Sequence, residues 1–249
     1  LEKEQLRQKR EEAQAQAKNE QLRANLLRSI SHDLRTPLTS ISGNAGILMS
    51  NPLDEITRKR LYTDIYDDSM WLYNLVENLL SVTRMEDGTM HINMQAELLE
   101  ELVMEALRHV SRKSKENVIR AELPDDLQLV RVDSKLIVQV LINLVDNAIK
   151  YTPGGSGIVI RSRAEGGRGL ISGADDGPGI PDEQKSRVFE MFYTAGNTVA
   201  DSRRGMGLGL ALCKSIITAH GGQITVTDNS PHGAVFTFSL TAAEVKIHE

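Results

Sequence analysis

The chain has 249 residues, enough for two modest domains with separate cores. Hydrophobic residues make up 40% and charged residues 25% of it, a composition that argues against a disordered chain. The net charge of −5, without a long run of one sign, argues against nucleic acid as a dedicated partner. The single cysteine, Cys213, excludes a disulfide within the chain and a cysteine cluster for zinc.

The N-terminal segment differs in composition from the rest. Residues 1–25 are rich in Glu, Gln, Lys, Arg and Ala and contain no Gly or Pro, which predicts one continuous exposed helix. This charged segment is unlike a signal peptide, and no stretch approaches the roughly 18 apolar residues needed to cross a bilayer. We therefore expect a cytoplasmic domain, and we expect any membrane part to lie outside this sequence.

Heptad spacing dominates the next segment. Apolar residues recur every seven positions at Leu27, Leu34, Ile41 and Leu48. This spacing is typical of a bundle helix, and a turn at 51–54 separates it from a second helical pattern over 61–82. The two helices predict a hairpin. Because two helices cover each other's apolar stripes poorly, we expect a homodimer that completes a four-helix bundle.

The pattern changes after residue 88 to short strand-like segments that alternate with helices. Strands are predicted at 91–94, 118–122, 127–132, 158–162, 170–174, 223–227 and 234–239. Helices are predicted near 96–114, 133–151 and 207–220. This order is typical of an α/β sandwich with helices on one face of a mixed sheet, and the linker at 86–90 is the expected domain boundary.

His32 lies in the middle of the first predicted hairpin helix. At 100° per residue it lies about 200° from Leu34, so its ring is expected to face water. Asp33 could hold one ring nitrogen and leave the other as a nucleophile. Thr36, one turn further on the same face, could position a water beside a phosphorylated ring. Pro37 removes a backbone hydrogen bond, so we expect the helix to bend there.

A lone exposed histidine is more often simply a solvated residue. We apply that interpretation to His91, His109, His220, His232 and His248. His32 differs because residues 32–38 resemble the phospho-acceptor box of two-component sensor histidine kinases. In that family the histidine is phosphorylated and the next acidic residue assists. The threonine at the position of Thr36 is associated there with dephosphorylation of the partner.

The predicted helix 133–151 has an apolar stripe and a separate polar face. The polar face carries Gln139, Asn143, Asn147, Lys150 and Tyr151. Such a face could be ordinary surface. However, amide oxygens suit Mg²⁺ when nucleotide phosphates supply the negative charge, and Lys150 could reach those phosphates. The face is therefore a candidate site for a nucleotide and its metal.

Asp175, Gly177 and Gly179 follow a predicted strand directly. Asp-Gly and Gly-Pro pairs mark surface turns in many proteins. In a nucleotide site, the glycines would let a flat base approach. The Asp175 carboxylate could then accept a hydrogen bond from the exocyclic amine of adenine, which guanine lacks at that edge.

A second glycine-containing segment leads into the last predicted helix. Its members are Gly205, Gly207, Leu208 and Gly209. A glycine loop alone is weak support, but backbone N–H groups at a helix N-terminus can bind phosphate. A polar segment precedes it, in which Arg203 and Arg204 could close on the phosphates.

These segments together look like the N, G1, F and G2 boxes of the Bergerat-fold ATPases. The boxes correspond to 141–151, 175–180, 189–192 and 205–210, and the whole resemblance covers about residues 20 to 240. It implies that Asn147 binds Mg²⁺ with support from Asn143 and Gln139. It also implies that Lys150 and Tyr151 contact phosphate or ribose and that Asp175 binds adenine.

The resemblance implies an α+β chain in three parts. They are a connecting helix at 1–25, a dimeric hairpin for histidine phosphotransfer at 26–86, and a Bergerat-type ATP-binding sandwich at 91–243. The implied function is autophosphorylation of His32 from ATP, transfer to an Asp of a response-regulator receiver domain, and phosphatase action on that partner. Two alternatives stay open: a Bergerat-fold ATPase without histidine transfer, and a non-catalytic dimeric signalling scaffold.

A narrower likeness concerns residues 26–44 and 206–213, which are similar to the cytoplasmic core of the Kdp potassium-responsive sensor kinases. It implies potassium sensing by a membrane-anchored protein. Gly173 departs from the family pattern, which leads us to expect a branched apolar residue there. Glycine at this position is expected to weaken strand packing and to loosen the adenine pocket.

Overall fold

The computed structural model describes residues 31, 34–50, 52–86, 90–110, 117–194 and 207–243. The chain divides into two compact units, one ending at Glu77 and the other beginning at Asn78. None of the helices in the described ranges combines the length and the apolarity that a membrane crossing requires.

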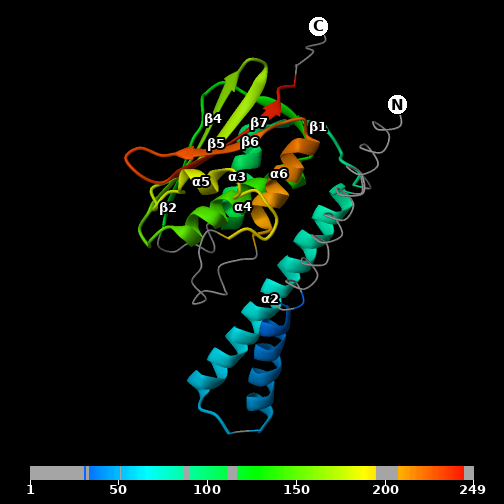
Figure 1. The fold of residues 1–249 in the computed structure, drawn as a ribbon, viewed down its shortest axis with the longest axis vertical. Coiled ribbons are helices and arrows are strands. Elements are labelled where there is room, and N and C mark those ends of the chain that lie inside the picture. The colour runs from blue at the N-terminus through cyan, green and yellow to red at the C-terminus, as the bar shows by residue number, and fades with distance from the viewer. Residues whose placement is uncertain are drawn as a thin grey trace, which may run out of the picture. The chain divides into compact units, whose positions relative to one another are not determined.

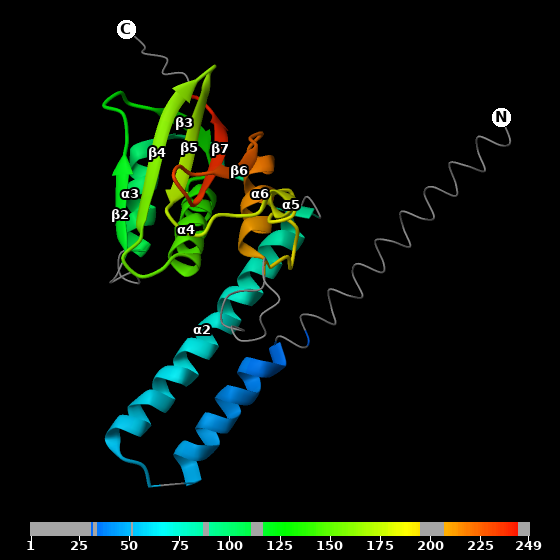
Figure 2. The ribbon, with the colours of Figure 1, turned by 60° about the vertical axis from the view of Figure 1, so that its left-hand side comes forward.

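The first unit contains most of a helical hairpin, as predicted, and the second helix of the hairpin continues past Glu77 into the second unit. Residues 34–50 form one helix, and α2 (Glu55–Glu86) runs back beside it (Figure 2). Asp54 lies directly before α2, where its Oδ2 accepts from the Thr57 hydroxyl (2.6 Å) and its Oδ1 from the Thr57 backbone N–H (2.9 Å). These hydrogen bonds lower the pKa of Asp54. Leu61 and Leu75 of α2 are 6% and 5% exposed, so the predicted apolar stripe is the packed face.

The second unit is built on a five-stranded mixed sheet. Its strands lie in the order β2 (Val118–Glu122), β4 (Gly157–Glu165), β5 (Arg168–Asp175), β7 (Ala234–Thr241) and β6 (Ile224–Asp228). β2 is parallel to β4, and the other neighbours are antiparallel. A separate antiparallel pair joins β1 (Gln95–Leu98) and β3 (Leu129–Val132). The predicted mixed sheet is thus confirmed.

Three longer helices form one layer against the five-stranded sheet (Figure 1). They are α3 (Leu99–Val110), α4 (Ser134–Tyr151) and α6 (Gly209–Ala219), with α4 in the middle. The apolar stripe predicted for α4 is buried, and Ile137 and Val140 are fully inaccessible. Asp133 begins α4 by accepting a hydrogen bond from the Leu136 backbone N–H (3.4 Å). A four-residue helix, α5 (Asp182–Lys185), was too short to predict from periodicity.

The strand predicted at 91–94 is wrong. Those residues belong to no strand, and the first strand is β1, which pairs with β3. The backbone N–H of Asn93 donates to the Asp133 carboxylate (3.0 Å) and not to a neighbouring strand. Because β1 occupies the predicted start of the following helix, α3 begins only at Leu99. Apolar alternation alone does not show which residues have a partner strand.

The interpretation of His220 as a solvated residue is also wrong, since only 2% of it is exposed. Its Nε2 accepts from the Asp133 backbone N–H (3.0 Å), so its Nδ1 carries the proton and donates to the Ile216 carbonyl (2.8 Å). The ring therefore ties the start of α4 to the end of α6. Asp133 and His220 are 87 positions apart in the chain, and no local pattern indicates their contact.

Replacing this ring tests its structural role. We expect His220→Leu to lower the free energy of unfolding by about 1–3 kcal/mol, because the Asp133 N–H loses its acceptor. Urea unfolding followed by circular dichroism measures the effect. His109→Leu, at an exposed position of α3, is the control and should change stability by less than about 0.5 kcal/mol. Equal losses in the two variants would contradict the role assigned to His220.

Candidate functional site

Asp175 ends β5 and is buried, with 8% of its surface exposed. Its Oδ1 accepts two backbone hydrogen bonds, from Gly177 (2.9 Å) and from Ala234 (3.2 Å). Burial raises the pKa of this carboxyl, although the two hydrogen bonds oppose the rise. No described residue donates to Oδ2. One oxygen of a buried carboxylate is therefore available to a ligand.

The turn after Asp175 packs closely on its surroundings. A Cβ on Gly177 would lie 2.8 Å from Thr152 Cγ2, at the end of α4, and 2.9 Å from Asp175 Oδ1. Gly179 has a φ of +76° and would bring a Cβ within 3.2 Å of the Gly233 carbonyl oxygen. Both positions therefore need glycine, which agrees with the close approach predicted for this segment.

The connection between β6 and β7 holds this turn in place. The Asn229 side-chain amide donates to the Asp175 carbonyl (2.7 Å), and His232 Nδ1 lies 3.3 Å from the Gly177 carbonyl. A Cβ on Gly233 would overlap the Asp175 carbonyl oxygen. Asn229 was not among the predicted site residues. Its only local signal is the Asn-Ser-Pro composition, which many surface turns share.

We expect Gly233→Ala to weaken ATP binding about tenfold, because the new methyl group must push the connection away from Asp175. Titration with a fluorescent ATP analogue measures the affinity. Gly155→Ala is the matched control: its φ of +88° imposes a similar backbone strain, but its Cβ would meet open space. If both variants bound equally well, contact with Asp175 would not be what requires glycine at 233.

The start of α6 meets the polar face of α4. Gln139 Nε2 donates to Asn143 Oδ1 (3.1 Å). Asn143 Nδ2 is buried and has no nitrogen or oxygen acceptor among the described residues, although Asn143 lies close enough to the buried Cys213 thiol to oppose the rise that burial causes in the pKa of that thiol. A Cβ on Gly209, the first residue of α6, would lie 4.0 Å from Asn143 Cγ. Gln139, Asn143 and Gly209, three of the predicted site residues, are thus neighbours. The buried Nδ2 of Asn143 is a hydrogen-bond donor that a ligand could use.

The remaining predicted residues of α4 continue toward its C-terminus. Asn147 is one turn beyond Asn143 and half-buried. Lys150 Nζ lies 5.6 Å from the ring centre of Tyr151, whose surface is 43% exposed. The helix ends beside Gly177, since a Cβ there would lie 3.6 Å from the Tyr151 carbonyl oxygen. Asp175 and the polar face therefore border the same region.

Gly207, before α6, packs on Phe192 and Tyr193. The Phe192 backbone N–H donates to the Gly207 carbonyl (3.1 Å), and a Cβ on Gly207 would overlap the Tyr193 carbonyl oxygen. Gly207 also has a φ of +65°, which favours glycine. Leu208, directly before α6, is 3% exposed. Three other predicted phosphate-binding residues lie outside the described residues: Arg203, Arg204 and Gly205.

The expected phospho-acceptor segment is described only in part, because His32 and Asp33 lie outside the described residues. Thr36 is exposed and Pro37 is buried. An open groove of about 750 Å³ runs along this helix, lined by Ser31, Leu34, Arg35, Leu38, Thr39, Ser42 and Gly43.

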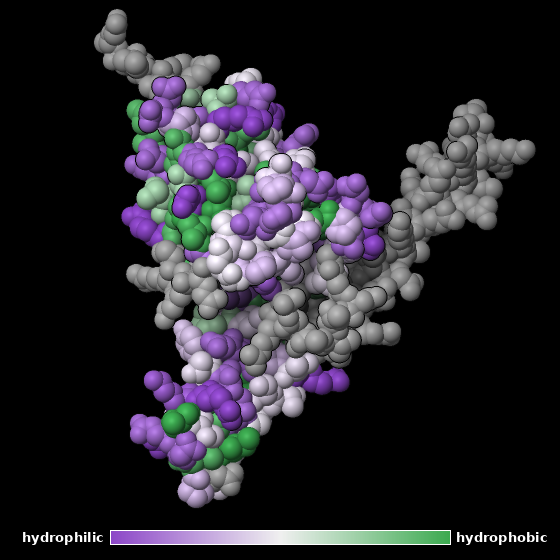
Figure 3. All heavy atoms as spheres, turned by 90° about the vertical axis from the view of Figure 1, so that its left-hand side faces the viewer, coloured by the Kyte–Doolittle hydropathy of each residue, from purple (hydrophilic) through white to green (hydrophobic). Residues whose placement is uncertain are grey.

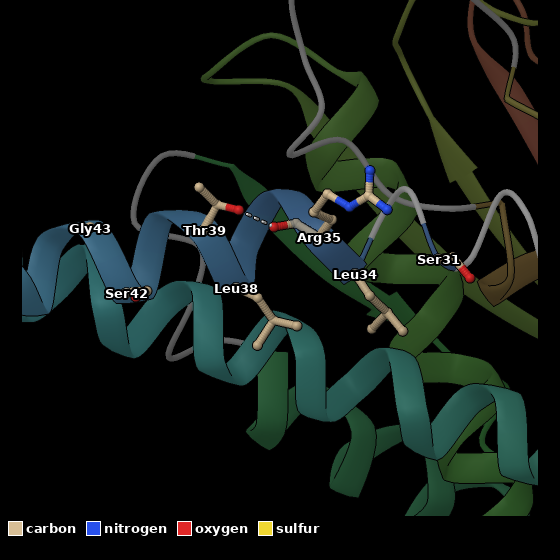
Figure 4. A pocket seen from close by; sticks show the side chains of 7 residues that line it. All are labelled: Ser31, Leu34, Arg35, Leu38, Thr39, Ser42 and Gly43. Carbon is tan, nitrogen blue, oxygen red and sulfur yellow. Dashed lines mark hydrogen bonds between the residues drawn. The ribbon is translucent and has the colours of Figure 1, made fainter.

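The groove has an apolar and a polar side. Leu34 and Leu38 project to one side of the helix, and Arg35 and Thr39 to the other (Figure 4). The Thr39 hydroxyl donates to the Arg35 carbonyl (2.8 Å). Leu38 remains 54% exposed. A single chain therefore leaves apolar surface of this helix uncovered.

Apolar surface also occurs at the tip of the hairpin. Figure 3 shows hydrophobic residues on the surface of this tip. Met49 and Ile56, on either side of the turn, are 87% and 84% exposed.

Two protein families match the chain. Residues 22–88 match the His Kinase A (phospho-acceptor) domain. Residues 132–244 match the family described as Histidine kinase-, DNA gyrase B-, and HSP90-like ATPase. The first range contains His32, and the second contains α4, the Asp175 turn and α6.

Curated relatives match over almost the whole chain. The Sensor protein KdpD of Clostridium acetobutylicum is 42% identical over 242 residues, which are 96% of this chain and 27% of that protein. Sensor protein KdpD of Escherichia coli is 36% identical, again over 96% of this chain and 27% of that protein. The chain thus spans about a quarter of the length of these two sensor proteins.

Solved structures of histidine kinases share the fold. The catalytic domain of histidine kinase ThkA is 33% identical, with a TM-score of 0.54, over 60% of this chain and 95% of that one. Histidine kinase ThkA in complex with the response regulator protein TrrA is 27% identical, with a TM-score of 0.66, over 88% of this chain and 61% of that one. With its phospho-acceptor hairpin and its ATPase unit both matched, the chain belongs to the sensor histidine kinases, as a core that resembles the Kdp sensors.

Proposed function

We propose that this core transfers the γ-phosphoryl group of ATP to His32 and then to an aspartate of a response-regulator receiver domain. The observation that carries the proposal is the Asp175 carboxylate, which is buried, uses Oδ1 for two backbone N–H groups and leaves Oδ2 for a ligand. An acceptor of this kind suits the exocyclic amine of adenine. Gly177 and Gly179 have no side chains, so the base could approach their backbone closely.

The polar face of α4 would receive the phosphates and Mg²⁺. The described residues contain no cluster of three His, Cys, Asp or Glu side chains able to hold a metal. Amide oxygens that share the ion with nucleotide phosphates fit such a site, because the phosphates supply the charge. We assign Asn147 as the metal ligand and Asn143 and Gln139 as its support. Bound Mg²⁺ would neutralise charge on the phosphates.

Other residues would position the phosphate chain. Lys150 and Tyr151 lie at the end of α4, where they would contact phosphate or ribose. The N-terminus of α6 offers backbone N–H groups and the positive end of a helix dipole. We assign the same phosphate-binding role to Arg203, Arg204, Gly205, Gly207, Leu208 and Gly209.

The reaction is an in-line displacement at phosphorus. One imidazole nitrogen of His32 attacks the γ-phosphorus while the bond to the β,γ-bridging oxygen breaks, which gives a phosphoramidate and ADP. Asp33 would hold the other nitrogen and orient the ring. A receiver aspartate would then take the phosphoryl group. Thr36, which is exposed, would position water for dephosphorylation of that partner.

We propose a homodimer in which two copies of the hairpin complete a four-helix bundle. The half-exposed Leu38 and the open groove on the helix 34–50 support this assembly, because a second hairpin would cover them. We assign dimerisation and histidine phosphotransfer to residues 26–86 and ATP binding to residues 91–243. We assign residues 1–25 to a helix that connects this core to further segments. The two KdpD sensor proteins, of which this chain spans about a quarter, support a place in a larger sensor protein.

Incubation with γ-labelled ATP, followed by acid and alkali, tests the proposed reaction. A phosphoramidate on histidine should lose its label in acid and keep it in alkali. Label that survives acid would contradict transfer to histidine. Phosphate release without labelled protein would favour an ATPase without histidine transfer, and absence of ATP binding would favour a non-catalytic scaffold.

A further inference from the structure

Gly173 occupies the core face of the central strand β5. It is two residues from Asp175, so both residues point to the same face of the sheet. Its partners across the sheet are Ile160 on β4 and Phe236 on β7. These side chains are 1% and 6% exposed, so Gly173 lies between two buried apolar groups.

The space above Gly173 is open. Among the residues that the structure describes, no heavy atom lies within 4 Å of a Cβ built there. On the same face four residues earlier, a Cβ on Gly169 would lie 2.9 Å from Val130 Cγ1 and 3.9 Å from Leu99 Cδ2. Gly173 is only half-buried. Because protein interiors are close-packed, a core-face position without such neighbours borders a hollow, and this one is open to solvent.

The backbone does not require glycine at this position. Gly173 is absent from the residues with positive φ, and it pairs regularly with both neighbouring strands. A residue with a side chain would therefore fit the strand. The structural consequence of glycine here is the missing side chain, and hence the hollow beside Asp175.

We propose that Gly173 deepens the base pocket, so that this kinase accepts adenine nucleotides that carry an apolar group on the exocyclic amine. This inference rests on the proposed role of Asp175 in binding that amine. An amine with one substituent keeps one N–H for the free Asp175 Oδ2 and directs the substituent toward the hollow. The apolar neighbours Ile160 and Phe236 suit a hydrocarbon group.

Autophosphorylation with ATP and with ATP benzylated on the exocyclic amine tests this specificity. The quantity to measure is the ratio of kcat/KM for benzyl-ATP to kcat/KM for ATP. We expect the wild-type ratio to lie within about tenfold of one. In Gly173→Val it should fall at least about tenfold, because the valine methyl groups occupy the hollow. Gly173→Ala should give an intermediate ratio.

Ser172→Val is the matched control, because the neighbouring residue points to the opposite face of β5 and should leave the ratio unchanged. Circular dichroism and thermal unfolding establish that each variant is folded, and Gly173→Ala serves if valine is not tolerated. Equal ratios in wild type and both Gly173 variants would overturn the proposal. So would a wild type that uses ATP but not benzyl-ATP. Failure with both nucleotides would instead contradict the proposed kinase function.

Discussion

Asp175→Asn should weaken ATP binding at least about 100-fold while leaving the fold intact. The asparagine oxygen can take the place of Oδ1 and still accept from Gly177 and Ala234. Its NH₂ group then replaces Oδ2 and presents a donor to the adenine amine, which is itself a donor. The variant thus removes the acceptor for the base without removing the hydrogen bonds that hold the turn.

Isothermal titration calorimetry with ATP measures the loss. Asp176→Asn is the matched control, because the adjacent Asp176 is exposed and accepts from the Gly157 backbone N–H (3.0 Å), outside the proposed base contact. It should bind ATP within about threefold of wild type, a difference of less than 1 kcal/mol. If Asp175→Asn bound ATP as tightly as this control, the assignment of Asp175 to adenine would be wrong.

Because the pKa of Asp175 is raised, the difference in unfolding free energy between Asp175→Asn and wild type should depend on pH. Folding disfavours the ionised carboxylate, so ionised Asp175 lowers the free energy of unfolding above its folded pKa. This penalty disappears as the pH falls through that pKa and the group becomes protonated. Without nucleotide, Asp175→Asn should therefore be at least as stable as wild type at pH 7, and any advantage should shrink as the solution is acidified. Thermal unfolding across this pH range measures the difference.

His32→Ala should reduce labelling from γ-labelled ATP to background. Alanine has no nitrogen nucleophile, so the phosphoramidate cannot form. ATP affinity should stay close to that of wild type, because the proposed nucleotide contacts involve α4, the Asp175 turn and the start of α6. The expected result is thus a complete loss of transfer with binding retained, measured by labelling and calorimetry on the same preparation.

His91→Ala provides the control for the acceptor. His91 is exposed and precedes β1, and its replacement should leave labelling unchanged. Label retained in His32→Ala would show that another residue accepts the phosphoryl group. Loss of both labelling and ATP binding would indicate that residue 32 acts on the nucleotide site and not as the acceptor.

Much of the architecture could be predicted because helix periodicity is a local property. The apolar positions of α4, such as Ile137 and Val140, are buried as their spacing predicted. The heptad pattern likewise predicted the hairpin. The prediction of a strand at 91–94 was wrong because a strand forms only where a partner strand is available. β1 forms where it can pair with β3, whereas the backbone N–H of Asn93 donates to Asp133.

The sequence by itself determined the types of chemical group in the candidate site: a histidine in its motif, a polar helix face, and glycines beside Asp175. Only the tertiary structure decided which groups meet. Asn229 reaches Asp175 across 54 positions, and His220 reaches Asp133 across 87. The hollow at Gly173 likewise depends on the neighbouring strands and helices. Contacts of this kind follow from strand order and helix packing, which no local pattern of residues contains.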